Sequence, residues 1–224
     1  MRQGDDVADS LEPALRRLMV QIAHDMYARR FVTATEGNLS TRLDDERLLI
    51  TPTMTNKGQL TEDQLALVDM QGRPLGAGRP SAEIDLHLVC YRERPDVNAV
   101  VHAHPPIATA FTVAGLELAQ RSLPEIVVSF GSIPTAPYGT PTTPELGQTV
   151  VGLIRNCDAV LLEKHGSLTV GRTLIHAFET LERLEWAAEV SLWARLLGKA
   201  EALPDAQVEK LLAIRASIQK RPYA

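Results

Sequence analysis

The spacing of apolar residues predicts helices near both ends of the chain. Between residues 10 and 29, apolar side chains recur every three or four positions, which is the pattern of an amphipathic helix. The same spacing returns at residues 173–197 and, over a shorter stretch, at residues 205–218. A further helix is expected at residues 82–92, with Ser81 as its N-terminal cap.

Between these helices, short apolar runs that stop at turn-forming residues predict strands. Four runs have this form, at residues 48–50, 66–70, 97–104 and 159–162. The third run stops at two consecutive prolines, where the backbone donors of a strand disappear. Helices that alternate with short strands favour an α/β or α+β layered fold, and the pattern leaves the strand order open.

Length and composition narrow the class of protein. We expect the 224 residues to form one domain, 1–224, with a core at about 10–200 and a C-terminal helix and tail at 205–224. Hydrophobic residues make up 45% of the chain and charged residues 23%, which excludes a disordered or fibrous protein. The net charge of −5 and the absence of a lysine and arginine run argue against a nucleic-acid or membrane partner and favour a small molecule.

The sequence also predicts a cytoplasmic location. The first residues are polar and acidic, so we expect neither a secretory signal nor a membrane span. Cys90 and Cys157 are isolated in sequence, which is typical of reduced cysteines in a protein core and not of a disulfide framework or a zinc ribbon.

A pair of histidines at the end of the third predicted strand is the main candidate for chemistry. Side chains alternate between the two faces of a strand, so His102 and His104 point the same way and are within reach of one metal ion. A catalytic metal site commonly takes three protein ligands, and His165, after another predicted strand, is the candidate for the third. Three neutral imidazoles would leave the full charge on a divalent ion. The competing interpretation is a pair of ordinary polar residues at a strand end.

Glu83 is the candidate acid or base. It is expected in the first turn of a helix, where a carboxylate commonly does no more than interact with the helix dipole. Its place beside a loop rich in glycine, proline and serine favours a position in a pocket, where it can exchange protons with a substrate. We do not predict His24, His87 or His176 as ligands, and we reject Lys164 as a Schiff-base nucleophile because it adjoins a proposed ligand.

Six short stretches carry a family resemblance. They are Gly37-Asn38-Leu39-Ser40, Ile50-Thr51-Pro52-Thr53, Pro80-Ser81-Ala82-Glu83, Ala99-Val100-Val101-His102-Ala103-His104, Pro134-Thr135-Ala136-Pro137-Tyr138 and Lys164-His165-Gly166. In order and spacing, from about Thr35 to Trp193, they resemble the class II aldolase/adducin family, especially its L-fuculose-1-phosphate aldolase branch. This resemblance implies a three-layer α/β/α sandwich with a central, mainly antiparallel sheet, and a cyclic homotetramer with active sites at the subunit interfaces.

The resemblance also implies a metal-dependent aldolase that reversibly cleaves a ketose 1-phosphate to dihydroxyacetone phosphate and an aldehyde through a metal-stabilised enediolate. One divalent ion per subunit, Zn2+ or in its place Mn2+, Co2+ or Fe2+, is expected on the three histidines, with Glu83 as an added ligand when substrate is absent. Glu83 and Tyr138 would be catalytic, Tyr138 reaching the site of a neighbouring subunit. The residues implied for the substrate phosphate are Asn38, Thr53 and Ser81.

Two departures from the family pattern concern the phosphate. Met54 stands where the branch usually has glycine, and Ala82 stands where a second serine is common. Both open the question of whether a phosphate is required. Tyr223, near the C-terminus, is a further residue that resembles one folding over the site in some members.

Other functions on the same fold remain alternatives. They are a sugar-phosphate 4-epimerase, a dehydratase, a decarboxylase and a non-catalytic adducin-type interaction module. The epimerase branch typically has an aspartate at the Glu83 position, so the glutamate favours an aldolase. The retained histidines argue against a non-catalytic module. A metallohydrolase is disfavoured because no aspartate and histidine follow soon after His104.

Overall fold

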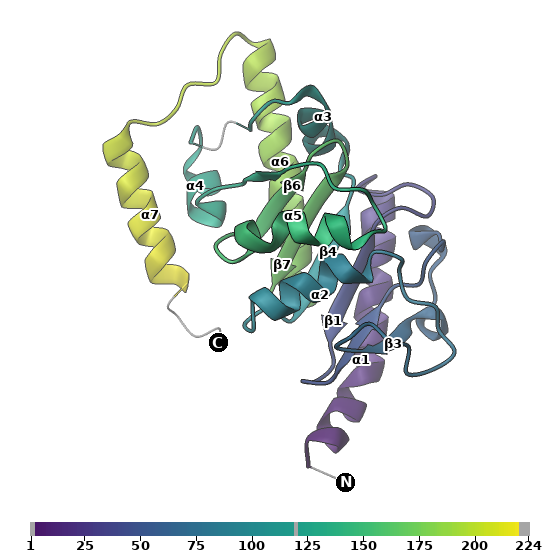
Figure 1. The fold of residues 1–224 in the computed structure, drawn as a ribbon. Coiled ribbons are helices and arrows are strands. Elements are labelled where there is room, and N and C mark those ends of the chain that lie inside the picture. Colours follow the sequence, from purple (N-terminus) through teal and green to yellow (C-terminus); the bar gives the residue numbers. More distant parts are fainter. Residues whose placement is uncertain (1–2, 119–120, 220–224) are drawn as a thin grey trace.

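The computed structural model describes residues 3–118 and 121–219, and within them the centre of the fold is a seven-stranded sheet with the order β3-β2-β1-β4-β7-β6-β5 (Figure 1). The strands are β1 (Asn38–Arg42), β2 (Arg47–Ile50), β3 (Ala66–Asp69), β4 (Ala99–Ala103), β5 (Thr135–Ala136), β6 (Ala159–Leu162) and β7 (Gly166–Gly171). Neighbouring strands pair antiparallel except β5 and β6, which are parallel. The α/β class is confirmed, but the sheet is mixed. A parallel pair needs a crossover connection, and the helix between β5 and β6 provides it.

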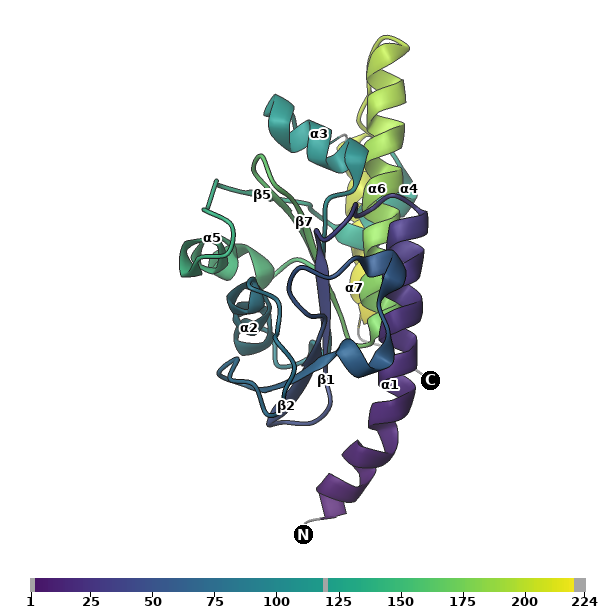
Figure 2. The same cartoon turned by 90° about the vertical axis from the view of Figure 1, so that its right-hand side faces the viewer.

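Helices cover both faces of the sheet, which Figure 2 shows edge-on. Their bounds are α1 (Gln3–Ala28), α2 (Ile84–Glu93), α3 (Pro106–Ala114), α4 (Pro124–Phe130), α5 (Pro144–Ile154), α6 (Leu174–Leu196) and α7 (Asp205–Gln219), with short 3-10 helices at Lys57–Gln59 and Glu62–Gln64. α2 and α5 lie on one face, and α1 and α6 lie on the other. The result is three layers. None of the described helices has both the length and the apolar character that a membrane crossing requires.

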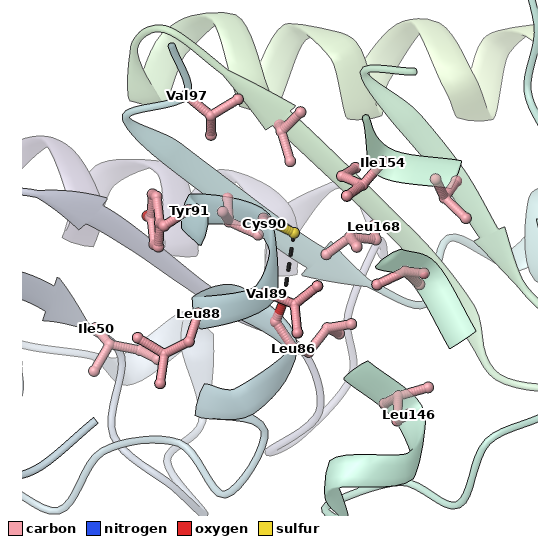
Figure 3. Packing of buried hydrophobic residues seen from close by; sticks show 14 of the residues in the cluster. Ile50, Leu86, Leu88, Val89, Cys90, Tyr91, Val97, Leu146, Ile154 and Leu168 are labelled. Atoms are coloured by element: carbon pink, nitrogen blue, oxygen red, sulfur yellow. Dashed lines mark hydrogen bonds between the residues drawn. The ribbon is translucent and has the colours of Figure 1, made fainter. Parts of the chain in front are cut away.

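Apolar side chains fill the space on each side of the sheet. Between the sheet and α2 and α5, residues such as Leu88, Leu146 and Leu168 are buried together (Figure 3). On the opposite face, α1 and α6 bury Met26 and Leu181 against strands β1, β2 and β4. β4 therefore has apolar neighbours on both faces, and its five residues are all buried. A strand enclosed in this way is fixed in place, which matters for the residues at its end.

The predicted helices and strands are present, with bounds shifted by a few residues. α1 is the largest change, because it begins at Gln3 and continues through Pro13. β1 and β7 were not predicted, because each begins next to a glycine in a stretch that resembles a turn. The short β5 and the helices α3, α4 and α5 were also missed, although α4 and α5 both begin with a proline at the first helical position.

Close packing at the start of β7 gives a testable prediction. A Cβ atom on Gly166 would lie 2.5 Å from the carbonyl oxygen of Ala103 and 2.6 Å from Cδ2 of His104. Gly166→Ala therefore forces β7 away from β4, and we expect a loss of about 1–3 kcal/mol in the free energy of unfolding, measured by urea denaturation.

Gly152 supplies the matched control. It lies within α5, and a Cβ atom there would meet nothing within 4 Å. Gly152→Ala should raise the free energy of unfolding by roughly 0.5–1 kcal/mol, because alanine loses less backbone entropy on folding. Equal unfolding midpoints for the two variants would contradict the tight contact at Gly166.

Candidate metal centre

His165 meets His102 and His104, which are distant from it in sequence, at one end of the sheet. β4 and β6 both pair antiparallel with β7, and both end opposite its first residues. His104 follows β4 and His165 lies in the turn between β6 and β7, so the two become neighbours. His102 lies within β4, two residues before His104, and projects from the same face. We call this end of the sheet the histidine end.

The three imidazoles face one another. Nε2 of His102 lies 3.1 Å from Nε2 of His104. The ring centroids are 4.9 Å apart for His102 and His104, 4.8 Å for His102 and His165, and 4.9 Å for His104 and His165. One nitrogen atom from each ring can be chosen so that all three lie within 4.8 Å of one another. This is the spacing of ligands that share a single ion.

Burial keeps these imidazoles neutral. It lowers the pKa of His102 well below the ordinary value, lowers that of His104 to about 3 and also lowers that of His165. Nδ1 of His102 lies 2.9 Å from the carbonyl oxygen of Ser167, which can only accept a hydrogen bond. Nδ1 therefore carries the hydrogen, and the lone pair of His102 lies on Nε2, toward the other two rings.

The donor set fits a divalent cation. Three neutral imidazoles and one carboxylate supply nitrogen and oxygen ligands of the kind that Zn2+ binds, and Mn2+, Co2+ or Fe2+ accept the same donors. The Glu83 carboxylate lies on the same side, with Oε2 at 3.4 Å from Nε2 of His102 and Oε1 at 3.6 Å from Nε2 of His165. The structure thus brings together the four residues predicted from the sequence, and their binding of a metal stays a prediction.

The segment from His104 to the start of α3 is anchored by Phe31 and by Glu185 of α6. The His104 backbone N–H donates to the carbonyl oxygen of Phe31 at 2.9 Å. The carboxylate of Glu185, in α6, accepts from the N–H groups of Ile107 and Ala108 at 2.9 and 2.8 Å, at the start of α3. A carboxylate at a helix N-terminus satisfies donors that have no partner within the helix. These contacts fix the direction in which the chain leaves β4.

Glu83 is held at the beginning of α2. It occupies the N-cap position itself, so the prediction that Ser81 is the N-cap was wrong by two residues. Ser81 still acts there, because its Oγ accepts from the Glu83 N–H at 3.2 Å. The carboxylate of Glu83 is also held, because Nδ2 of Asn38 donates to its Oε2 at 2.8 Å. Both contacts place the carboxylate beside the histidines.

The residues expected to bind phosphate lie at the same end. The segment that follows β2 runs beside the segment before α2, with Ser81 N–H donating to Thr51 O at 3.1 Å and Thr53 N–H donating to Arg79 O at 3.2 Å. Asn38 occupies the first position of β1. Met54 has a φ of 54°, which favours glycine, and its side chain is 78% exposed, so it points away from the fold.

Lys57 is a functional candidate that the sequence did not reveal. Its side chain is only 1% exposed, and its ammonium donates to the carbonyl oxygens of Thr35 and Thr55 at 3.2 and 2.7 Å. Burial lowers its pKa to about 8, against the attraction of the Glu36 and Glu83 carboxylates. A lysine in a polar loop gives no sequence signal of burial, because most such lysines are solvated.

Tyr138 is more loosely connected to the site. It follows β5, its side chain is 51% exposed, and its backbone N–H donates to Oε2 of Glu163 at 3.1 Å. Within the described residues, no hydrogen bond joins its hydroxyl to the three histidines or to Glu83. Its predicted role in the site of a neighbouring subunit stays a prediction. Tyr223 lies outside the described residues.

Comparison with known proteins decides the family. Residues 17–192 match the model of the class II aldolase and adducin N-terminal domain. The chain belongs to this family. The match spans the strands and helices that form the histidine end, and it confirms the resemblance seen in the six short stretches of sequence.

Proteins similar to this chain are named for different reactions. The chain is 34% identical over 203 residues to the 3-oxo-tetronate 4-phosphate decarboxylase of Haemophilus influenzae, covering 88% of this chain and 96% of that one. It is 36% identical over 172 residues to the L-fuculose phosphate aldolase of Methanococcus vannielii, covering 77% and 92%. The crystal structure of Escherichia coli YgbL, for which an aldolase, epimerase or decarboxylase activity has been proposed, superposes with a TM-score of 0.83 at 32% identity, covering 90% of this chain and 99% of that one.

Removal of a predicted ligand tests the metal centre. We expect His102→Ala and His165→Ala to lose bound zinc, measured by elemental analysis after exhaustive dialysis, because each removes one of three neutral nitrogen donors. His24→Ala is the matched control, because His24 is exposed in α1 and hydrogen-bonds to Leu60 O. Full zinc content in either site variant would refute the assignment.

The buried histidines also predict how the metal-free protein responds to acid. The pKa values of His87 and His104 fall to about 4 and about 3, below the ordinary 6.5, so protons bind more readily to the unfolded chain. The contribution of these neutral histidines to the free energy of unfolding is fully present above pH 6.5, and it falls as the pH drops toward 4. At about pH 5 each histidine should cost on the order of 2 kcal/mol, measured by urea unfolding with a chelator. A stability that is constant between about pH 7 and 5 would contradict this prediction.

Proposed function

We propose that this protein is a divalent-metal-dependent lyase that breaks a carbon–carbon bond beside a carbonyl group in a phosphorylated sugar. The favoured reaction is the reversible cleavage of a ketose 1-phosphate to dihydroxyacetone phosphate and an aldehyde. The observation that carries the proposal is the meeting of three neutral imidazoles and one carboxylate at the histidine end. Such a set suits a reaction that leaves negative charge on oxygen and carbon.

His102, His104 and His165 would hold the cation. When bound, a divalent cation there would stabilise negative charge on neighbouring substrate oxygens. Glu83 would exchange a proton with the carbon that keeps the electron pair of the broken bond, since a carboxylate oxygen is held on the same side as the histidines. Asn38 would keep the other carboxylate oxygen in a fixed hydrogen bond during this step.

Aldol cleavage needs a second proton acceptor. The hydroxyl group that becomes the aldehyde must lose its proton as the bond breaks, and Tyr138 is the proposed acceptor in the site of a neighbouring subunit. Its exposed side chain, on a loop next to β6, supports this role, because an exposed phenol is available to another chain. The homotetramer and the cytoplasmic location form part of the same proposal.

Lys57 supports a substrate with negative charge. Its buried ammonium makes contacts with two carbonyl oxygens and, within the described residues, forms no ion pair within 4.0 Å. A buried cation without a close counter-ion attracts anions. Because its ammonium donates to the carbonyl oxygen of Thr55, we propose that the adjoining loop of Thr53 and Met54, with Ser81 and Asn38, receives the substrate phosphate.

Decarboxylation of a phosphorylated 3-oxo sugar acid is the second candidate. It is favoured by the 34% identity to the Haemophilus influenzae decarboxylase over nearly the whole of both chains. The two reactions leave the same kind of charge on the substrate, and Glu83 would protonate the carbon in both. They differ in the fragment that leaves. An aldehyde forms only when a hydroxyl group loses its proton, whereas carbon dioxide forms without this loss.

A paired assay with a Tyr138→Phe variant tests the proposal and separates the two reactions. Release of dihydroxyacetone phosphate is measured over a panel of ketose 1-phosphates, and release of carbon dioxide over 3-oxo sugar-acid phosphates. We expect turnover that a chelator abolishes and added zinc restores. If the reaction is aldol cleavage, Tyr138→Phe should lower kcat by about 100-fold or more, because a general base contributes about 10²–10⁴-fold.

The matched control is Tyr27→Phe, since Tyr27 is another exposed tyrosine, located in α1. It should retain the kcat of the wild type. Carbon dioxide release that persists in Tyr138→Phe would assign the decarboxylation, and turnover that survives complete removal of metal would refute both candidates.

A further inference from the structure

A chain of hydrogen bonds leads from the protein core to Glu83. Tyr91 Oη lies 2.7 Å from Ser40 Oγ, which lies 2.7 Å from Nδ1 of His87. Nε2 of His87 lies 2.5 Å from Oδ1 of Asn38, and Nδ2 of Asn38 donates to Oε2 of Glu83 at 2.8 Å. The residues predicted from the sequence to act in the site do not include Ser40, His87 or Tyr91.

The chemistry of the groups fixes the direction of this chain. The Glu83 carboxylate only accepts, so Asn38 must turn its NH2 group toward it and its oxygen toward His87. Nε2 of His87 must then carry the hydrogen. Burial lowers the pKa of His87 to about 4, so the ring is neutral and Nδ1 accepts from the hydroxyl of Ser40. Tyr91 donates to Ser40, and every polar atom in the chain has one consistent role.

The periodicity of the two elements explains why these residues meet. Glu83, His87 and Tyr91 are spaced four residues apart and lie on one face of α2 and its N-terminus. Asn38 and Ser40 are two residues apart in β1 and project from one face of the sheet. α2 packs on that face, as Figure 3 shows for Tyr91 and its neighbours in the core.

A purely structural role accounts poorly for this arrangement. Ser40 and His87 are 0% exposed and Tyr91 is 2% exposed, in an otherwise apolar layer between α2 and the sheet. Polar groups in such a place are costly unless every one is bonded, and apolar residues of similar volume would pack there at less cost. This series of hydrogen bonds reaches the histidine end only through the Glu83 carboxylate, whose Oε2 lies 3.4 Å from Nε2 of His102.

We infer that His87 is a positioning residue, held as the Nε2–H tautomer, that locks the Asn38 amide so that it points an N–H at Glu83. The inference rests on the proposed function. With Oε2 of Glu83 engaged by Asn38, Oε1 is the oxygen that exchanges a proton with substrate. The second N–H of Asn38 makes no hydrogen bond within the described residues and is directed by the same lock, which makes it available to a substrate oxygen.

Two substitutions of His87 separate positioning from packing. His87→Leu removes both ring nitrogens and puts an apolar side chain of similar size in place of the ring, so the Asn38 amide is free to turn. His87→Gln retains one donor and one acceptor. We expect His87→Leu to lower kcat about 10- to 100-fold with unchanged zinc content, and His87→Gln to recover most of the loss.

The control is Val89→Ala, which removes a buried apolar group from the same helix. It should lower the unfolding midpoint and keep the kcat of the folded enzyme. A kcat for His87→Leu equal to that of the wild type, or an equal loss in Val89→Ala, would overturn the inference.

A spectroscopic measurement tests the lock in the resting protein. In 15N-labelled wild type, the nitrogen shifts of His87 should report the neutral Nε2–H tautomer from about pH 5 to 8, and one Asn38 side-chain amide proton should exchange slowly with solvent. That protection should disappear in His87→Leu and persist in His87→Gln. An Nδ1–H tautomer would overturn the inference. Because no substrate is needed, this result is independent of whether the proposed reaction is correct.

Discussion

The antiparallel register around β4 is the constraint on which the rest of the site depends. In this register Asn38 of β1 pairs with His102, and His102 pairs with Leu168 of β7. The same pairing brings the turn that holds His165 beside the end of β4. A shift of one residue would turn His102 and His104 together to the opposite face of the sheet and separate them from His165. Burial of β4 on both faces makes such a shift costly.

Burial of polar side chains explains both the neutral state of the histidines and a loss of stability at the site. Imidazoles removed from water hold neutral nitrogen atoms ready for a cation, and they have low pKa values for that reason. Lys57 and His87 are buried nearby without lining the histidine cluster, and each needs hydrogen-bond partners to be tolerated. Stability is therefore given up to keep polar groups in fixed orientations, which is common at functional sites.

Much of the site could be predicted from the sequence because its main signals are local. The spacing of His102 and His104 on a strand and the place of Glu83 at a helix start need only the geometry of single elements. β1 and β7 were missed because Gly37 and Gly166 resemble turn residues, and only pairing with β4 makes these segments strands. The burial of Lys57 was likewise invisible, since it depends on how two loops pack and not on the residues near it in sequence.

The choice between aldol cleavage and decarboxylation lies outside the histidine cluster. In the proposed function, the three histidines, Glu83 and Asn38 would act on the half of the substrate that keeps the electron pair, and this half is alike in both reactions. The half that departs needs a proton acceptor when it leaves as an aldehyde. It needs no such group when it leaves as carbon dioxide. The selective elements must therefore be the exposed segments near the site, above all the loop that carries Met54 and the loop that carries Tyr138. Exposed loops can vary at little cost to stability, whereas the register of β4 cannot. In the proposed function, this difference would let one fold carry out several reactions at the histidine end.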